Sequence, residues 1–592
     1  MDAILGDTLT RHGLVWLMIL GAPLLTAAGC VVRPLRDTAL ALAPWSIAPA
    51  LAAAVWPPPS ADYPWLLLGT QLGLDQTGRI FLLFTAFLWF CSAVYAGSYL
   101  VEDRQRHRFF AFFLLTAAGN LGLIIAQDMV AFYFFFVLMT FSAYGLIVHD
   151  GTSNARRAGL IYVVMAVLGE VLLVTALLMI AMAGYGNLVN PAPVVAAGQH
   201  RNLMIALVLA GFGVKAGAAP LHLWLPLAHP VAPTPASAVL SGAMIKAGLL
   251  GWLRFLPLGE AALPEWSAVC MAAGLAAAFY GVLVGLAQFD PKTVLAYSSI
   301  SQMGVMLATV GLGLALPESW PLVRAAILFY ALHHSLAKGA LFLGVGMAGA
   351  AVGSPFRRFL FRAGTLLPAL AMAGAPLTSG ALAKAALKEI SYLLPSFWPV
   401  SLQWLLTFSA LATALLMAHF LFFFWSRSER DHAVHYPGTG QWLSWGLVLV
   451  GVFFAAWAAA PLDLEHIRAE LVSQKTLWSG LWTVLLGGLL GWAEWRRTAR
   501  TGKRVLPSIP PGDLLVPLAA LLNRLYGVWR TALQASHAKE PIDRLSANGT
   551  GVERLRSLMS TLTATEQKLL DWTTAGAVFL LLTIVLLALM VF

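Results

Sequence analysis

Four lysines interrupt long apolar stretches of the sequence, namely Lys215, Lys246, Lys338 and Lys384. A lysine at the middle of a bilayer costs on the order of 3 kcal/mol even on a lenient insertion scale, so such residues are expected to serve a function. Snorkelling to the interface explains Lys388, near the end of its stretch. It does not explain Lys215 or Lys384, because apolar residues flank each for about two helical turns on both sides. These lysines are candidate carriers of a proton or another cation.

Histidines accompany one of these lysines. His333, His334 and Lys338 lie within the apolar run AILFYALHHSLAKGALFLGVG. His334 and Lys338 are four residues apart and therefore share a helix face. A neutral imidazole can both accept and donate a proton, which favours a relay over a merely satisfied interior histidine. The direction in which His222 and His229 point cannot be predicted, because prolines lie between them. The histidines are not expected to bind a metal, because no carboxylate or cysteine stands at the spacing of a metal ligand.

Acidic residues are scarcer inside the apolar stretches. Glu170 lies near the centre of the stretch IYVVMAVLGEVLLVTALLMI. A buried carboxylate needs a charged partner or a proton, and Lys215 on the next predicted helix is the expected partner. Asp128 begins another stretch and is expected at an aqueous mouth. The run from Asp290 to Lys292 is interpreted as a loop.

Two of the lysine-bearing helices are predicted to be broken. Residues 216–221 read AGAAPL and residues 373–377 read AGAPL, so glycine and proline stand beside Lys215 and Lys384. Proline removes a backbone donor, and hydrocarbon tolerates the freed carbonyl only beside protein or water. Transporters place ion sites at such breaks. The two similar segments also suggest a duplicated five-helix unit.

Composition places the chain in a membrane. Of 592 residues, 59% are hydrophobic and only 11% are charged, which no soluble exterior accommodates. Three distant cysteines without a C-x-x-C pair argue against an iron–sulfur cluster or structural zinc. Neither usual nucleotide-binding loop is present. The net charge of +10 is interpreted as a topology signal, not as nucleic-acid binding.

The apolar stretches predict an all-α polytopic membrane protein with about sixteen transmembrane helices. The predicted spans are 13–31, 38–56, 78–100, 109–126, 129–149, 158–183, 202–225, 231–256, 264–288, 294–314, 322–350, 363–387, 400–425, 441–461, 474–493 and 571–592. Basic residues gather in the loops that follow odd-numbered spans, about two to one over the other loops, which places these loops in the cytoplasm. Both termini are therefore expected on the periplasmic side of an inner or cell membrane.

The segment 494–570 differs from the rest because it is polar. Within it, residues 513–533 place Leu, Ala and Val on one side, which is typical of an amphipathic helix lying along neighbouring spans or a membrane surface. A loosely ordered cytoplasmic linker is the alternative.

Three motifs resemble one known family. Residues 219–237 (APLHLWLPLAHPVAPTPAS), 292–304 (KTVLAYSSISQMG) and 333–342 (HHSLAKGALF) look like the antiporter-like, proton-conducting membrane subunits of respiratory complex I. The same family includes large subunits of Mrp-type antiporters, membrane-bound hydrogenases and a carbon-uptake complex. The resemblance covers roughly residues 110–425 and implies two inverted five-helix repeats, each with one broken helix.

The resemblance implies a division of the chain and a role for each matched residue. The expected parts are N-terminal helices (1–108), a first repeat (109–256), a second repeat (264–425), C-terminal helices (441–493), the polar segment (494–570) and a final span (571–592). Lys215 matches the central carrier of the first half and Lys246 the bridge between halves. His334 and Lys338 match the central relay of the second half, and Lys384 matches its exit residue. A polar segment before a last span also resembles the lateral helix of the distal complex I subunit.

One family residue is missing. The family carries a glutamate on the fifth span, seven residues before a tyrosine, where this chain has Val137 and Tyr144. We hypothesise that Glu170 replaces it from the sixth span. His222, His229, His333 and Asp128 are supporting residues in this interpretation.

The sequence therefore predicts a transport subunit without cofactor or metal of its own, and not a redox enzyme in itself. Its partners are expected to be other membrane subunits, with any quinone bound by one of them. A NADH:quinone oxidoreductase-like or hydrogenase-like module would drive H⁺ through the relay. A Mrp-type cation/proton antiporter and an energising subunit for inorganic-carbon uptake are the alternatives, and Na⁺ or K⁺ stays open as the ion.

Overall fold

The computed structural model describes residues 11–67, 69–184, 189–394, 398–429, 436–457, 472–503, 505–507, 509–515, 517, 520 and 524. The chain divides into two compact units, Met1–Pro511 and Gly512–Phe592. The account below concerns the first unit, which holds nearly all described residues. The predicted final span, 571–592, and most of the predicted lateral segment lie outside the described residues.

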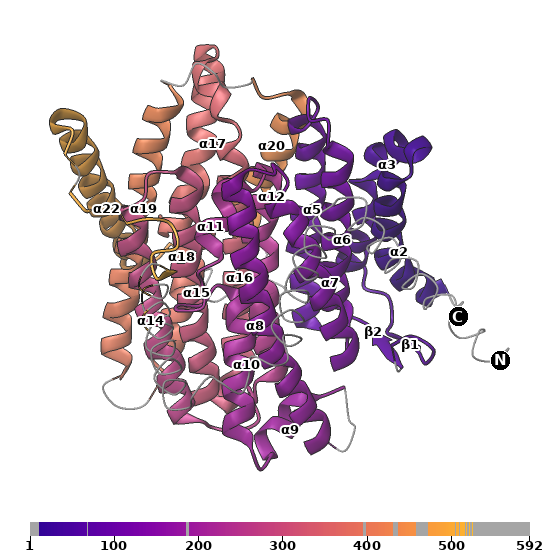
Figure 1. The fold of residues 1–592 in the computed structure, drawn as a ribbon. Coiled ribbons are helices and arrows are strands. Elements are labelled where there is room, and N and C mark those ends of the chain that lie inside the picture. Colours follow the sequence, from indigo (N-terminus) through magenta and orange to yellow (C-terminus); the bar gives the residue numbers. More distant parts are fainter. Residues whose placement is uncertain are drawn as a thin grey trace, which may run out of the picture. The chain divides into compact units, whose positions relative to one another are not determined.

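The first unit is built from helices (Figure 1). The α-helices are α2 (Arg11–Val31), α3 (Arg36–Leu42), α4 (Ala48–Val55), α5 (Gln76–Tyr99), α6 (Arg106–Ile125), α7 (Met129–Ile147), α8 (Ser153–Ala183), α9 (Pro191–Ala197), α10 (Arg201–Ala216), α11 (Leu225–Val231), α12 (Thr234–Val239), α13 (Ile245–Phe255), α14 (Pro264–Leu286), α15 (Pro291–Ala315), α16 (Trp320–Val345), α17 (Pro355–Ala373), α18 (Ser379–Ser391), α19 (Trp398–Ser428), α20 (Thr439–Phe454) and α22 (Gln474–Thr501). The shorter turns are the 3-10 helices η1 (Arg33–Leu35), η2 (Trp45–Ile47), η4 (Pro317–Ser319) and η5 (Ala348–Val352) and the π-helix η3 (Leu240–Met244).

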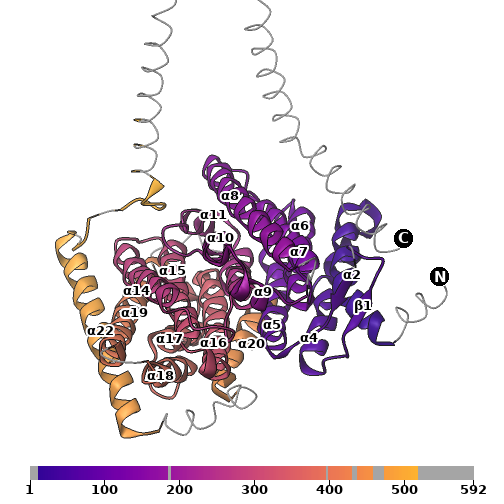
Figure 2. The ribbon, with the colours of Figure 1, turned by 90° about the horizontal axis from the view of Figure 1, so that it is seen from below.

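Twelve described helices are long and apolar enough to cross a membrane, or thirteen if the pair α3–α4, bent by 63°, counts as one span. The multi-span prediction is confirmed, whereas the number of sixteen stays a prediction, because the predicted span 571–592 lies outside the described residues. The two spans predicted to be broken are the interrupted pairs α10–α11 and α17–α18. Seen from the side and from below, α22 lies against α19 at one edge of the unit, far from α2 (Figures 1 and 2).

A short hairpin corrects the purely helical expectation. Strands β1 (Ala61–Tyr63) and β2 (Thr70–Leu72) pair antiparallel, with Ala61 opposite Leu72. Three prolines (57–59) precede β1, and proline cannot continue a helix because it lacks the N–H donor. The Tyr63 hydroxyl donates to the Gly13 carbonyl at 2.6 Å, so the hairpin attaches to α2.

The helix α22 extends beyond the predicted end at residue 493. It continues to Thr501, and Gly502 in the left-handed conformation (φ 64°) closes it by donating its N–H to the Thr498 carbonyl. Its last turns carry basic residues, which interact favourably with the carboxyl end of a helix dipole. The first residues of the predicted polar segment thus belong to α22.

Both predicted breaks are present. Gly217 (φ 68°) ends α10 and Gly374 (φ 80°) ends α17, each in the left-handed region that glycine adopts without strain. Leu377 also has positive φ (63°), and Thr378 then caps α18 by accepting from the Ala381 N–H. At both breaks the last backbone carbonyls of the helix lack the usual N–H partner of a continuous helix. They are therefore polar positions inside the helical bundle that side chains can contact.

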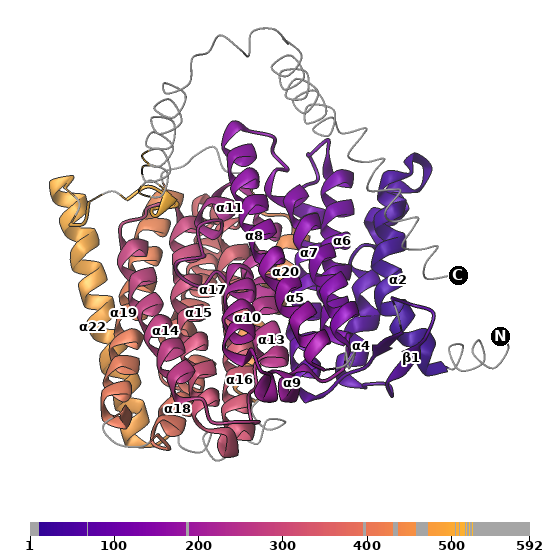
Figure 3. The same ribbon diagram turned by 60° about the horizontal axis from the view of Figure 1, so that its bottom comes forward.

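A close crossing of α10 and α13 brings two lysine-bearing helices together (Figure 3). Gly248 permits it, because a Cβ there would lie 2.6 Å from the Phe212 carbonyl oxygen and 2.6 Å from the Ala216 nitrogen. Membrane helices commonly use small residues for such backbone contact. The contact fixes the helix that ends beside Lys215 against the helix that carries Lys246.

Gly248→Ala is expected to lower stability by about 1–3 kcal/mol, because backbone atoms on α10 cannot give way to the new methyl group. Thermal unfolding of the purified protein, followed by tryptophan fluorescence, measures the change. Gly97→Ala on α5 is the matched control, since no heavy atom lies within 4 Å of the added carbon. Equal melting temperatures for the two variants would contradict the close crossing.

Candidate functional site

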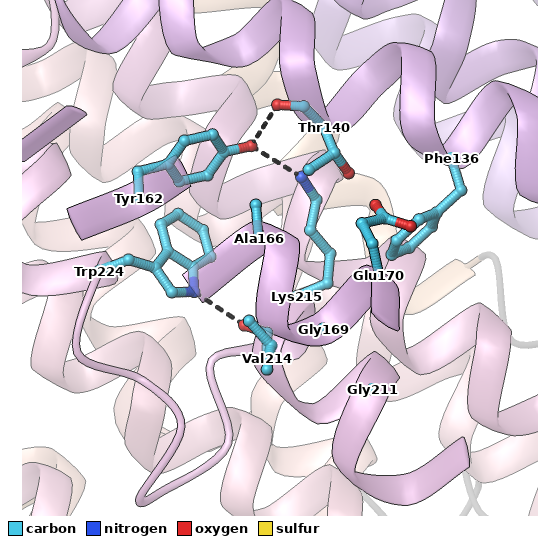
Figure 4. A pocket seen from close by; sticks show the side chains of 10 residues that line it. All are labelled: Phe136, Thr140, Tyr162, Ala166, Gly169, Glu170, Gly211, Val214, Lys215 and Trp224. Atoms are coloured by element: carbon cyan, nitrogen blue, oxygen red, sulfur yellow. Dashed lines mark hydrogen bonds between the residues drawn. The ribbon is translucent and has the colours of Figure 1, made fainter. Parts of the chain in front are cut away.

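Lys215 ends in a buried polar cavity. It occupies the last turn of α10 and is 4% exposed. Its Nζ donates to the Tyr162 hydroxyl at 3.1 Å, and that hydroxyl donates to the Thr140 carbonyl at 2.6 Å (Figure 4). The ammonium also lies over the rings of Tyr162 (5.5 Å) and Phe136 (5.9 Å). The surroundings of the ammonium are thus two aromatic faces and one hydroxyl. Such surroundings stabilise a buried charge only weakly.

Glu170 lines the same cavity, which lies between helices α7, α8 and α10. The carboxylate is 8% exposed, and neither oxygen makes a hydrogen bond of normal geometry, although the hydroxyls of Tyr133 and Thr140 lie next to it. No ion pair within 4 Å joins it to Lys215 among the described residues. The two side chains, on neighbouring helices as predicted, face one cavity without contact, an arrangement that suits an intervening water.

Lys246 and Lys338 each donate to a backbone carbonyl beside a hydrogen-bonded pair of serines. The Lys246 Nζ donates to the Ser241 carbonyl at 2.6 Å, and the Ser241 and Ser299 hydroxyls are 2.7 Å apart. The Ser299 hydroxyl donates to the Leu295 carbonyl (3.0 Å), which also accepts from Lys338 Nζ (2.8 Å). Both lysines are fully buried. Because carbonyls only accept, these contacts hold the two lysines in place without forming a continuous proton path.

His334 lies between these lysines. It is fully buried, and neither ring nitrogen has a hydrogen-bond partner in the described protein. Lys246, Lys338 and His333 are close enough to act on it electrostatically. His229 is similar: its ring is fully buried, has no partner at either nitrogen and stacks on Phe342 at 4.5 Å. Because buried polar groups are almost always satisfied, both rings are suited to bind water.

Lys384 stabilises the second break. Its Nζ donates to the last carbonyls of α17, at Met372 (3.1 Å) and Ala373 (2.6 Å). This lysine is only partly buried, in contrast to the other three. His333 reaches the first turn of α18, because its Nδ1 is 2.8 Å from the Ser379 hydroxyl. The break thus brings the histidine helix α16 and the lysine helix α18 into contact.

A second cavity, of about 260 Å³, lies beside Lys384. The Tyr330 hydroxyl donates to Gln302 Oε1 at 2.7 Å, and Gln302 Nε2 donates to the Thr413 hydroxyl at 3.1 Å. Together with Ser409, these residues give the cavity a polar wall from α15, α16 and α19. This cavity lies beside the second break, as the cavity at Lys215 lies beside the first.

Residues 290–292 are not a simple loop. Asp290 caps α15 by accepting from the Thr293 N–H at 2.8 Å, and Lys292 belongs to the first helical turn. The Lys292 Nζ donates to the Ala232 carbonyl at 2.6 Å, where α11 ends. Sequence reasoning missed this buried contact because Lys292 stands at the edge of its apolar stretch.

Two supporting residues have structural contacts. Asp128 caps α7, accepting from the N–H groups of Ala131 (2.8 Å) and Gln71 (3.1 Å), and is 5% exposed. One of these donors belongs to strand β2, and the aqueous mouth expected at Asp128 stays a prediction. His222 is fully buried, with its Nε2 3.3 Å from the Tyr280 hydroxyl. No group of three metal-ligating side chains occurs in the described part of the chain.

Comparisons with known proteins agree with this architecture. Residues 126–415 match the family model of NADH:quinone oxidoreductase/Mrp antiporter transmembrane proteins. Hydrogenase-4 component B of Escherichia coli is 32% identical over 294 residues, which cover 48% of this chain and 44% of that protein. A putative antiporter subunit of Staphylococcus saprophyticus is 32% identical over 353 residues, covering 55% and 44%. The matches thus span less than half the length of these relatives.

Solved structures share the fold. The structure of the Mrp complex from a Dietzia species superposes with a TM-score of 0.72 at 22% identity, covering 94% of this chain and 63% of that chain. A membrane-bound sulfane sulfur reductase, an archaeal respiratory membrane complex, gives a TM-score of 0.66 at 21% identity, covering 93% and 99%. The fold is that of an antiporter-like membrane subunit. The matched region, just under half of this chain, is similar to the NADH:quinone oxidoreductase/Mrp antiporter family.

Proposed function

We propose that this chain is a proton-translocating subunit of a multi-subunit complex in an inner or cell membrane. The observation that carries the proposal is the burial of Lys215, Lys246, His334 and Lys338 inside the helical unit. Two cavities, one lined by Lys215 and Glu170 and the other by Lys384, adjoin further ionisable side chains. Hydrocarbon excludes such groups unless they line a path or pair with one another.

The path runs from Glu170 and Lys215 through Lys246, His334 and Lys338 to Lys384. Each lysine alternates between its charged and neutral form as a neighbouring charge approaches or leaves, since charges interact strongly in a medium of low dielectric constant. Waters in the two cavities and beside His334 complete the connections that side chains leave open. Glu170 serves as the carboxylate partner of Lys215, in place of the glutamate absent at Val137.

The energy comes from a partner. A redox module of NADH:quinone oxidoreductase-like or hydrogenase-like type would drive H⁺ through the path, and any quinone would bind to that partner. A Mrp-type cation/proton antiporter is the second candidate function, with Na⁺ or K⁺ exchanged for H⁺. It is supported by the putative antiporter relative and by the likeness to the Mrp complex.

The proposal includes the organisation and orientation expected from the sequence. Residues 109–256 and 264–425 form two inverted repeats, each of which contains one of the broken helices. The loops after α5, α7 and α16 carry the excess of arginine and face the cytoplasm, while the chain begins on the periplasmic side.

Purification in mild detergent, followed by mass spectrometry, tests the assignment to a complex. We expect the chain to be recovered with other membrane subunits. Iron–sulfur or quinone-binding subunits among them would identify a redox-driven pump, and small antiporter subunits would identify the second candidate. Recovery of a lone chain that transports cations unaided would contradict the proposal.

A further inference from the structure

A buried histidine and a carboxylate meet outside the proposed path. His419 on α19 is fully buried, and its Nδ1 lies 3.0 Å from Oε2 of Glu494 on α22. Its Nε2 lies 2.8 Å from the backbone carbonyl oxygen of Gln288, just after α14. The Glu494 side chain is 14% exposed. Three segments far apart in the sequence therefore converge on one imidazole ring.

The hydrogen-bond partners of this ring require an additional proton. A backbone carbonyl only accepts, so Nε2 must carry the hydrogen that bonds to Gln288. In a neutral ring Nδ1 would then be an acceptor, facing a carboxylate that also only accepts. Two acceptors 3.0 Å apart repel each other unless a proton lies between them. The pair therefore holds one additional proton between His419 Nδ1 and Glu494 Oε2, and the proposal below assigns that proton to the ring.

The other histidines with hydrogen-bond partners in the described part of the chain do not meet this condition. His333 faces a serine hydroxyl, which can donate or accept. His149 contacts Asp103 through Nε2, but its Nδ1 has no acceptor opposite. His222 Nε2 faces the Tyr280 hydroxyl, which can donate or accept. Among the hydrogen bonds described for histidine rings, those of His419 place an acceptor opposite each ring nitrogen.

Aromatic rings exclude water from the imidazole. Phe289 and Phe423 pack on it with ring centroids 5.4 and 4.7 Å away. Several other charged side chains near this site contact partners of their own. Asp290 accepts from the Thr293 N–H, Lys292 donates to the Ala232 carbonyl, Arg358 donates to the Ala351 carbonyl, Arg362 pairs with Glu429, Lys384 donates to the last carbonyls of α17, and Arg496 lies over Trp492. Glu494 is the ionisable group in contact with the ring.

We propose that His419 and Glu494 form a proton-holding site, which takes up and releases a proton on the side of the membrane where the arginine-rich loops lie. The proton exchanges through Glu494, because its side chain is 14% exposed whereas that of His419 is fully buried. Exchange through Nε2 is blocked, because Nε2 donates to a carbonyl that cannot pass a proton onward. The site is thus a side store and not a step on the direct path. It serves the second half of that path, since α19 also lines the Lys384 cavity with Ser409 and Thr413. The role in transport rests on the proposed function.

Glu494→Gln separates proton holding from a structural role. The glutamine side chain keeps the size of glutamate, and its amide donates to Nδ1 of a neutral His419, so the contact between α19 and α22 survives. A structural contact alone would therefore leave transport unchanged. We expect proton transport by the intact complex in proteoliposomes to fall severalfold, less than removal of a group on the direct path would cause. The matched control is Trp495→Phe, which removes the Trp495–Ser426 hydrogen bond between the same helices.

A second readout does not depend on transport. In the complex labelled with ¹⁵N in histidine rings, we expect both nitrogens of His419 to be protonated in the wild type and only Nε2 in Glu494→Gln. A neutral wild-type ring, or unchanged transport in Glu494→Gln, would overturn the proposal. If Lys215→Met also left transport unchanged in the same assay, the proposed function would fail, whereas the nitrogen spectrum would still report on the pair.

Discussion

Lys215→Met is expected to abolish most proton transport, by roughly a hundredfold, a loss typical of removing a positioned proton-transfer group. Methionine has similar length and fills the space of the lysine side chain, so the walls formed by Phe136, Tyr162 and Trp224 stay in place. What disappears is the ammonium that faces Glu170 across the cavity. The rate of acidification inside proteoliposomes that carry the energised complex measures the effect.

Lys503→Met is the matched control for this variant. Lys503 is an exposed lysine just after α22, and its loss leaves both cavities unchanged. It should transport at the wild-type rate. Wild-type transport by Lys215→Met itself would remove Lys215 from the path.

Glu170→Gln is expected to have the second largest effect, a fall of roughly tenfold, because the carboxamide keeps the shape but removes the charge to which Lys215 responds. Glu170→Asp keeps the charge and should retain more activity than the glutamine variant. Initial transport rates of the three proteins, at matched amounts of assembled complex, give the comparison. Equal rates for Glu170→Gln and wild type would show that the carboxylate missing at Val137 has no replacement here.

Much of the fold follows from the sequence, because single charges and prolines stand out against apolar stretches. The breaks beside Lys215 and Lys384 were predictable, since glycine and proline end helices for local reasons. The shared location of Glu170 and Lys215 was also predictable, because consecutive membrane helices usually pack together. The family match over 126–415 confirms the resemblance carried by three short motifs.

The remaining features depend on contacts between distant segments. His419 and Glu494 are 75 residues apart, and nothing in either helix alone reveals that they meet. The hydrogen bond between the Ser241 and Ser299 hydroxyls, near Lys246 and Lys338, could likewise not be predicted from the sequence. Serine is common in helices, and packing determines which group it contacts. The length of α22 was underestimated, since its last turns lose the apolar pattern while remaining helical.

The central claim is that protons cross the membrane through the buried groups of this chain. Its most direct test is proton flux into proteoliposomes that contain the intact complex, energised through its partner subunits and followed with an internal pH dye. The wild type should conduct protons, and Lys215→Met combined with Lys384→Met should not, while both assemble equally. Equal flux through the two proteins would mean that protons take another route, and the account would be wrong.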